Sequence, residues 1–270
     1  MLNCAIMTIS NQTPSDHDAT QAFLDTLPEL APGERFRFAC HPKVPCFNAC
    51  CSDLSLMLTP YDVLRLRAQL GLSSRDFIAR HALAAQAPDT GFPMLRLRMR
   101  DDIPGSPCPF VTREGCSVYP GRPGACRTYP LGRATKTGEA GEVLEQFFVV
   151  REPHCKGFEQ DADWTSADWL KDQDLREYNR HNDRYMLLLA QARQRQSRLD
   201  QKQANMVFLA AFNLDAFRDF LANTRLMDRL DMPEEAKAAA LADESSRLEF
   251  AMDWLELALF GVERNLKKKA

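Results

Sequence analysis

Eight of the nine cysteines in this 270-residue chain lie between residues 40 and 155. They fall in four short segments whose prolines and glycines suit the tight turns that bring several sulfurs together. Thiolate sulfur is a preferred ligand of zinc and of iron–sulfur clusters. We therefore predict a metal centre in this stretch. Its candidate ligands are Cys40, Cys46, Cys50, Cys51, Cys108, Cys116, Cys126 and Cys155.

Disulfides are the alternative, and the choice depends on the compartment. The first twenty residues have no basic start and no long apolar run, so we expect no secretory signal. No apolar run approaches the roughly 18 residues that a membrane helix needs. We therefore expect a cytoplasmic protein, where clustered cysteines are metal ligands more often than disulfides. The ninth cysteine, Cys4, is interpreted as a lone thiol without a ligand role.

The net charge and the absence of known catalytic motifs limit the classes of function that we expect. A net charge of −3 gives no electrostatic argument for nucleic-acid binding. The chain has no glycine-rich phosphate loop, no G-x-S-x-G elbow and no H-E-x2-H motif. We therefore expect neither a nucleic-acid nor a membrane partner, and no catalytic residue is assigned.

The adjacent cysteines Cys50 and Cys51 limit the ways in which a metal can be bound. In an extended segment adjacent side chains point to opposite sides, so both do not easily bind one zinc ion. They serve different metals, or different irons of one cluster, or one of them is not a ligand. Eight thiols are enough for two tetrahedral sites, and His41, His81 or His154 could replace a weak member.

Seven arginines face only three acidic residues between Arg96 and Arg133. Metal–thiolate centres are anionic, so nearby arginines would offset their charge. The alternative is that these arginines form an ordinary solvated face.

The distribution of residues predicts an α+β protein with a separate helical part. We assign residues 1–33 to a loose leader with a short helix around Gln21–Leu27, 34–158 to the cysteine-cluster domain and 159–270 to a helical domain. Between 160 and 266 the chain has no cysteine, one proline and one glycine.

Local signals predict the main elements. Thr59 and Pro60 mark a helix start that Gly71 ends, and Ser73 caps a second helix that runs to about Ala82. Alternation and β-branched content predict strands at 94–100 and 142–150. Further helices are expected at 167–199, at 205–224 with a break near Asn213, at 233–242 and at 244–261. His181 is expected on a helix surface, and the three tryptophans are expected to anchor helix packing.

Several ordered motifs resemble the YkgJ-type cysteine-cluster family, whose members are described as zinc- or iron-chelating and sometimes as iron–sulfur oxidoreductases. They are C-x3-C-C at 46–51, L-T-P-Y-D-V at 58–63, C-P-F at 108–110, G-C-S-V-Y at 115–119 and R-P-x2-C-R-x-Y-P at 122–130. The resemblance covers about residues 36–158, and with His154 it supports Cys155 as a ligand. Many members begin C-x2-C-x2-C-C, whereas five residues separate Cys40 from Cys46 here. Whether Cys40 fills the missing position stays open.

The spacing favours an iron–sulfur cluster over zinc, because the C-x2-C pairs typical of structural zinc are absent. Three functions remain. The first is a metal or iron–sulfur protein in electron transfer or metal handling. The second is an iron–sulfur enzyme of unknown substrate, and the third is a zinc-stapled module whose C-terminal helices bind a protein partner.

Overall fold

The computed structural model describes residues 7–8, 28–137 and 143–269, and it confirms the α+β class. The short helix expected around Gln21–Leu27 lies outside the described residues. The chain forms two compact units, each made from two separate stretches. The cysteine unit comprises Met1–Met57 and Arg96–Arg180, and the helical unit comprises Leu58–Leu95 and His181–Ala270. The residue composition predicted a cysteine-cluster domain at 34–158 and a helical domain at 159–270. These domain limits stay a prediction.

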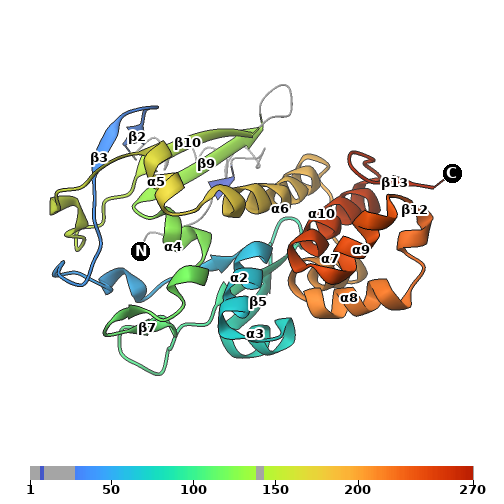
Figure 1. Cartoon of the computed structure of the whole chain (residues 1–270), viewed down its shortest axis with the longest axis horizontal. Coiled ribbons are helices and arrows are strands. Elements are labelled where there is room, and N and C mark those ends of the chain that lie inside the picture. The colour runs from blue at the N-terminus through green and yellow to red at the C-terminus, as the bar shows by residue number, and fades with distance from the viewer. Residues whose placement is uncertain (1–6, 9–27, 138–142, 270) are drawn as a thin grey trace. The chain divides into compact units, whose positions relative to one another are not determined.

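A four-stranded sheet in the order β1-β9-β10-β2 runs through the cysteine unit (Figure 1). Its strands are β1 (Met7–Thr8), β2 (Glu29–Leu30), β9 (Leu131–Thr137) and β10 (Val143–Val149). β9 pairs with β10 antiparallel, which places Arg133 opposite Phe147. The side chain of Arg133 is buried and forms an ion pair with Glu145 at 2.6 Å. This arginine is therefore a structural part of the sheet.

An aromatic core lies beside a second, two-stranded sheet of β3 (Arg35–Arg37) and β11 (Asp163–Thr165). Trp169 on α5 (Ser166–Asp172) packs edge-to-face against Phe36 and Phe38, with ring centroids 6.1 and 5.6 Å away. Its indole Nε1–H donates to the Thr128 carbonyl at 3.0 Å. Edge-to-face pairs of this kind add to the free energy gained by burial. The expected role of this tryptophan as a packing anchor is confirmed.

The single helix expected over 167–199 is wrong. The structure has α5 followed by α6 (Arg176–Gln194). Between them Asp174 adopts a left-handed conformation with φ 52°, and the Leu175 N–H bonds to the Leu170 carbonyl at 3.0 Å. Aspartate tolerates this conformation because its short side chain is polar, so a helix can end without glycine or proline.

The loops that carry the cysteines contain only short elements. They are η1 (Ala49–Cys51), β7 (Val111–Thr112), β8 (Gly115–Cys116), η2 (Tyr119–Gly121), α4 (Gly124–Thr128) and η3 (Gly157–Glu159). Such segments gain little from regular hydrogen bonding alone. Their shape therefore depends on turns and on whatever the sulfurs bind.

A three-stranded sheet has the order β4-β6-β5. The strands are β4 (Met57–Leu58), β5 (Ala82–Gln86) and β6 (Pro93–Leu97). β6 alternates buried and more accessible residues, as the apolar and basic residues of this segment predicted. The expected strand at 94–100 is thus confirmed in its first half.

The first helices of the helical unit form as their local signals predicted. α2 (Pro60–Leu70) starts with a capping box in which Thr59 and Asp62 satisfy each other's backbone N–H groups. It ends at Gly71, whose φ of 64° is the left-handed conformation that glycine adopts without strain. α3 (Ser74–His81) is capped by the Ser73 side chain.

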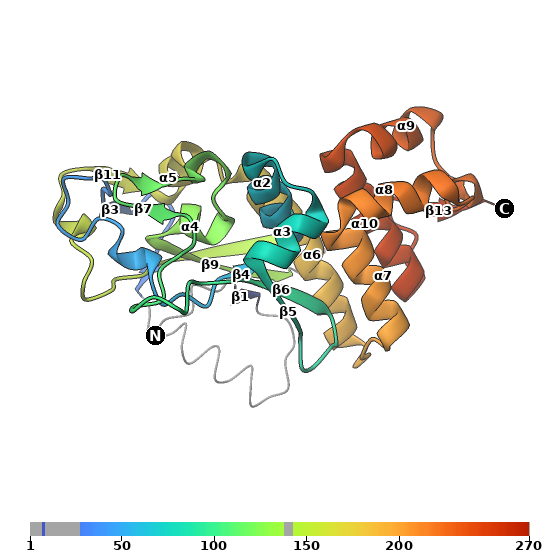
Figure 2. The same ribbon diagram turned by 90° about the horizontal axis from the view of Figure 1, so that it is seen from below.

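The remaining helices pack together, and Figure 2 shows them from a second side. They are α7 (Gln201–Phe212), α8 (Leu214–Asn223), α9 (Glu234–Ala242) and α10 (Glu244–Phe260), joined by η4 (Met227–Arg229) and by the pair β12 (Leu230–Asp231) and β13 (Lys267–Lys268). The break expected at Asn213 is confirmed. Trp254 stacks on Phe217 at 5.5 Å within this core. Among the described residues, none of the helices has the length and apolarity required to cross a membrane.

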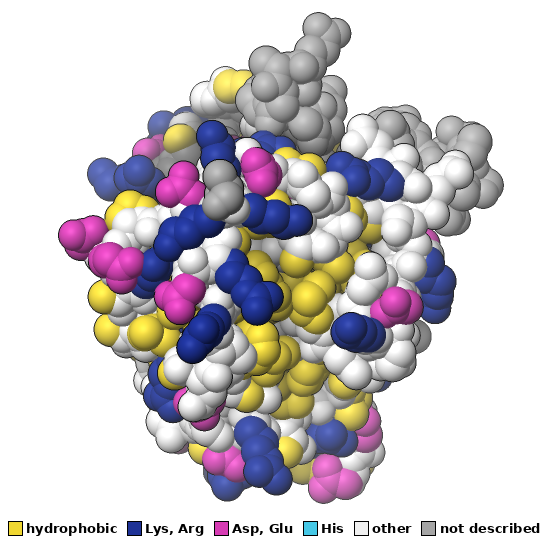
Figure 3. All heavy atoms as spheres, turned by 90° about the vertical axis from the view of Figure 1, so that its right-hand side faces the viewer, with side chains coloured by type: hydrophobic (Ala, Val, Ile, Leu, Met, Phe, Trp, Pro, Cys, Tyr) yellow, Lys and Arg dark blue, Asp and Glu magenta, His cyan; other side chains and the backbone are white. Residues whose placement is uncertain are grey.

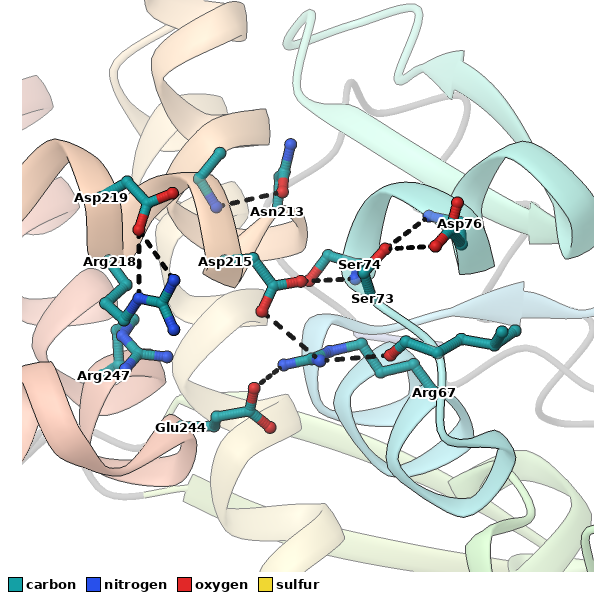
Figure 4. A network of polar contacts seen from close by, with 12 residues as sticks. Arg67, Ser73, Ser74, Asp76, Asn213, Asp215, Arg218, Asp219, Glu244 and Arg247 are labelled. Carbon is teal, nitrogen blue, oxygen red and sulfur yellow. Dashed lines mark hydrogen bonds and ion pairs between the residues drawn. The ribbon is translucent and has the colours of Figure 1, made fainter.

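A charged network connects α2 and α3 to α8 and α10 (Figure 4). Arg67 is 5% exposed and forms ion pairs with Glu244 and, at 3.7 Å, with Asp215. The Asp215 carboxylate also accepts the Ser74 backbone N–H at 2.6 Å. The buried guanidinium is thus compensated by two carboxylates from helices that follow it far along the sequence.

Asp215 gives this network a pH dependence. Partial burial opposes its charge, but the Ser74 N–H and the charge of Arg67 prevail and hold the pKa of this carboxyl below its usual value. A carboxyl with a lowered folded-state pKa stabilises the fold above its unfolded pKa and loses that contribution as the pH falls. We expect Asp215→Asn to lose less stability than the unchanged chain between about pH 5 and pH 3. Circular-dichroism unfolding midpoints would measure this, and parallel curves would contradict it.

The expectation that His181 lies on the surface is wrong. Its side chain is 2% exposed and its ring stacks on Tyr61 at a centroid distance of 4.2 Å. Its Nε2 lies 3.4 Å from the Ser245 hydroxyl. The polar neighbours Asn182 and Asp183 suggested solvent, but Asn182 is also buried.

Candidate metal centre

The first four cysteines lie in a loop built from consecutive turns. Hydrogen bonds from Val44 N to His41 O, Phe47 N to Val44 O, Ala49 N to Cys46 O and Cys51 N to Asn48 O wind residues 41–51 into a compact coil. Asn48 takes a left-handed conformation with φ 68°, which asparagine tolerates. Its side chain donates to the Thr112 carbonyl at 3.0 Å, which fixes this loop to the β7–β8 hairpin.

Cys108 and Cys116 lie at the ends of that hairpin. The Cys108 N–H donates to the Cys51 carbonyl at 2.8 Å, and β7 pairs with β8 so that Val111 lies opposite Cys116. Burial raises the pKa of both thiols. Backbone N–H groups of Phe110 and Val111 oppose this shift at Cys108, and that of Val118 does so at Cys116. Backbone donors directed at sulfur favour the thiolate, the form that binds metal.

Cys126 is exposed on α4, close to a buried arginine. Burial lowers the pKa of Arg122, and the nearby Cys126 and Cys116 sulfurs partly restore it. The Arg122 guanidinium also lies 3.7 Å from the centre of the Tyr119 ring and donates to the Tyr119 carbonyl at 2.8 Å. Arg122 therefore lies near cysteine sulfurs, as we expected of the arginines in this stretch. Its contacts with Tyr119 hold its side chain there.

Cys155 is brought to the first loop by backbone contacts. The N–H of the next residue, Lys156, donates to the Cys46 sulfur at 3.0 Å, and the Ala39 N–H donates to the Gly157 carbonyl at 3.0 Å. Cys155 also packs against the aromatic core that contains Phe38 and Trp169. One loop therefore joins the cysteines to the hydrophobic core.

Gly157 is the closest point of this loop to the core, and it predicts a sensitive position. A Cβ atom there would lie 2.5 Å from a ring carbon of Phe38 and 3.0 Å from the Ala39 carbonyl oxygen. Since Phe38 is 2% exposed and held by other rings, we expect Gly157→Ala to destabilise the protein by about 1–3 kcal/mol. Chemical denaturation would measure this.

Gly132→Ala is the matched control for that substitution, because its Cβ would meet the Val150 side chain at 3.3 Å and no backbone atom closer than 4.0 Å. Equal stability losses in the two variants would contradict the packing argument.

Cys50 and Cys51 lie in the 3-10 turn η1 and not in an extended segment, so the expectation that they point to opposite sides is wrong. In a 3-10 turn successive side chains diverge by about 120°, which allows neighbouring sulfurs to meet. The Cys51 thiol donates a hydrogen bond to Cys50 and lowers the pKa of Cys50 to about 7. The same hydrogen bond, together with burial, raises the pKa of Cys51.

Charge interactions link sulfurs from different segments of the chain. The pKa of Cys40 is raised to about 11, chiefly because its sulfur is partly buried and also because the charges of Cys50, Cys46 and Cys155 act on it. Cys51, besides its contact with Cys50, has Cys126 and Cys108 as charged neighbours, and Cys108 has Cys116.

The donor chemistry fits a thiolate-bound metal. None of these eight cysteines forms a disulfide, and thiolate sulfur is the ligand that tetrahedral zinc and iron–sulfur clusters take. Within residues 28–137 and 143–269, however, no three Cys, His, Asp or Glu side chains converge closely enough to hold an ion as they stand. Binding of an ion here would therefore require the cysteine side chains to rearrange, and such coupling to folding is common for metal sites.

The histidines considered as substitutes have other contacts. His154 lies 3.3 Å from the Glu152 carboxylate, and the His41 Nδ1 accepts the Lys43 N–H at 3.3 Å. His81 belongs to α3 of the helical unit, where its ring packs on Phe77. Sequence reasoning missed Tyr129, whose hydroxyl faces Cys155. The pKa of Tyr129 is raised chiefly because the side chain is buried, and the Cys155 thiol raises it further. Its presence in the R-P-x2-C-R-x-Y-P motif was the available signal.

Short loops that gather eight free thiols define a cysteine-cluster metal-binding domain. Residues 39–156 match the family described as "CxxCxxCC: Putative zinc- or iron-chelating domain". This match falls within the stretch that carries the YkgJ-type resemblance and confirms that resemblance. No curated protein and no solved structure matches the chain.

Proposed function

We propose that this protein holds an iron–sulfur cluster through the cysteines of the cysteine unit and acts in electron transfer or metal handling. The supporting observation is the gathering of eight free thiols from four segments, with backbone N–H groups directed at Cys46, Cys108 and Cys116. N–H···S hydrogen bonds stabilise metal-bound thiolates and set the potential of iron–sulfur clusters. A cluster bound here would supply reversible one-electron transfer.

Iron–sulfur is favoured over zinc for two reasons. The chain lacks the C-x2-C pairs of structural zinc sites. The C-x3-C-C segment places two sulfurs in hydrogen-bond contact at Cys50 and Cys51, an arrangement suited to a centre with several metal atoms. We place the protein in the cytoplasm, where reducing conditions keep such thiols available.

Metal analysis of the protein purified without oxygen tests this proposal. We expect iron and acid-labile sulfide in comparable amounts, with a visible absorption that bleaches when dithionite is added. Stoichiometric zinc with neither sulfide nor visible absorption would contradict the iron–sulfur assignment.

A zinc-stapled interaction module is the second candidate, and a surface feature favours it. Figure 3 shows a strip of apolar side chains bordered by lysines and arginines on the face at the right of Figure 1. Helices α7, α8 and α10 leave Phe208, Phe220 and Phe260 only half-buried. Apolar patches of this kind mark interaction sites. The same metal analysis decides between the iron–sulfur protein and the zinc-stapled module. Bound zinc without redox activity would favour the module, whose function would be to bind a protein partner.

A further inference from the structure

We infer that three exposed arginines of the cysteine unit, Arg96, Arg98 and Arg100, form a docking surface for an acidic protein segment in an extended conformation. We name these three residues the arginine row. This inference rests on the proposed function and adds the kind of partner that meets the metal-binding loops.

Burial alternates along the segment that carries the arginine row. The apolar residues Leu95, Leu97 and Met99 are buried, and the arginines between and after them are exposed. This is the pattern of an extended chain, in which every second side chain points to the same side, about 6.7 Å from the next. The three guanidinium groups therefore share one side of the segment as a regular row of positive charge.

Backbone hydrogen bonds hold both ends of the arginine row. Arg96 lies on β6, which is paired on both sides in the sheet of order β4-β6-β5. At the other end the Arg100 N–H donates to the Pro107 carbonyl at 3.0 Å. The residue after Pro107 is Cys108, whose N–H donates to the Cys51 carbonyl at 2.8 Å. A segment bound along the row would therefore end beside the loops that carry these candidate metal ligands.

The protein does not itself neutralise the two ends of the arginine row. Among residues 28–137 and 143–269, Arg96 and Arg100 form no ion pair. The buried arginines of the same stretch differ in this respect, since Arg133 pairs with Glu145 at 2.6 Å. The charge of the row is thus directed to solvent, where carboxylates of another molecule would complement it.

The surroundings of the arginine row favour a protein partner over a nucleic acid. Arginine pairs with carboxylates in bidentate fashion and is enriched in protein interfaces. Ile103 is 36% exposed, and its N–H donates to the Arg100 carbonyl at 3.1 Å, so an apolar residue lies next to the end of the row. Asp101 and Asp102 are also exposed there and would repel a phosphate backbone that continued past the row. An extended peptide with carboxylates at alternate positions has the same repeat as the row.

Fluorescence anisotropy on the protein purified without oxygen tests the inference. The probe is a labelled peptide in which glutamate alternates with threonine. We expect the unchanged chain to bind this peptide with an affinity that falls as salt is added. The variant Arg96→Gln/Arg98→Gln/Arg100→Gln should bind it about tenfold more weakly, because three exposed charge pairs of modest strength are lost together.

The variant Arg75→Gln/Arg80→Gln/Arg225→Gln is the matched control, because it removes the same charge from three exposed arginines of the helical unit. It should bind the peptide as the unchanged chain does. Circular dichroism and metal analysis check that both variants keep the fold and the metal content of the unchanged chain.

No binding of the peptide by the unchanged chain, or equal binding by the two triple variants, would overturn the docking surface and leave the proposed function intact. Tighter binding of an oligothymidylate of equal charge than of the peptide would also overturn it, in favour of a nucleic-acid partner. Absence of bound metal from the unchanged chain would overturn the proposed function, while the comparison of the two variants would still decide whether the arginine row binds acidic peptide.

Discussion

Replacing Cys50 or Cys126 by serine is expected to release bound metal and to destabilise the cysteine unit severely. A thiolate-bound structural metal contributes on the order of 10 kcal/mol to folding, which is comparable to the whole stability of a typical domain. The loops that hold these residues contain only the short elements η1 and α4, and turn and side-chain hydrogen bonds take the place of longer helices or strands. Metal analysis by mass spectrometry and thermal unfolding would measure both effects.

Cys4→Ser provides the control for that experiment, because it makes the same chemical change at the cysteine that lies apart in sequence from the other eight. It should leave metal content and unfolding temperature unchanged. Metal content equal to that of the unchanged chain in both Cys50→Ser and Cys126→Ser would remove these residues from the ligands.

The second large effect is expected in the helical unit, where Arg67→Met should destabilise the protein by about 2–3 kcal/mol. The substitution keeps much of the apolar stem but removes the charge that compensates Asp215 and Glu244. Loss of one partner of a fully buried ion pair costs about 3–5 kcal/mol. We expect a smaller loss of stability for Arg67→Met because the side chains of Asp215 and Glu244 are about one-third exposed. Urea unfolding followed by circular dichroism would measure the change.

Arg218→Met is the matched control in the same network (Figure 4). Arg218 is half exposed and pairs with the exposed Asp219, so its loss should cost much less stability than the loss of Arg67. If Arg67→Met were as mild as Arg218→Met, the network would contribute little to stability.

Features governed by neighbouring residues could be predicted from the sequence. The start of α2 follows from Thr59, Pro60 and Asp62, and its end follows from Gly71, all within one segment. The α7–α8 break at Asn213 likewise has a local cause, because the Asn213 side chain caps the second helix. The gathering of cysteines was predictable because thiols are rare enough for clustering to carry meaning.

Features governed by distant residues could not be predicted. His181 is buried because Tyr61, 120 positions earlier, stacks on it. The polarity of its neighbours gave no sign of this. Arg67 is buried because carboxylates arrive from helices that begin near Asp215 and Glu244. The approach of Cys155 to Cys46 depends on the hydrogen bond from Lys156 N to the Cys46 sulfur, which no spacing rule encodes.

The contact between Cys155 and the aromatic core gives the protein an intrinsic optical probe. Trp169 belongs to the buried cluster against which both Cys155 and Trp164 pack, with the two indole ring centroids 5.2 Å apart, whereas Trp254 belongs to the helical unit. Bound iron or cobalt quenches nearby indole emission by energy transfer. Loading of the cysteines should therefore dim the fluorescence of Trp164 and Trp169, and replacing Trp254 with phenylalanine would isolate that signal, so that metal uptake could be followed in real time without a label.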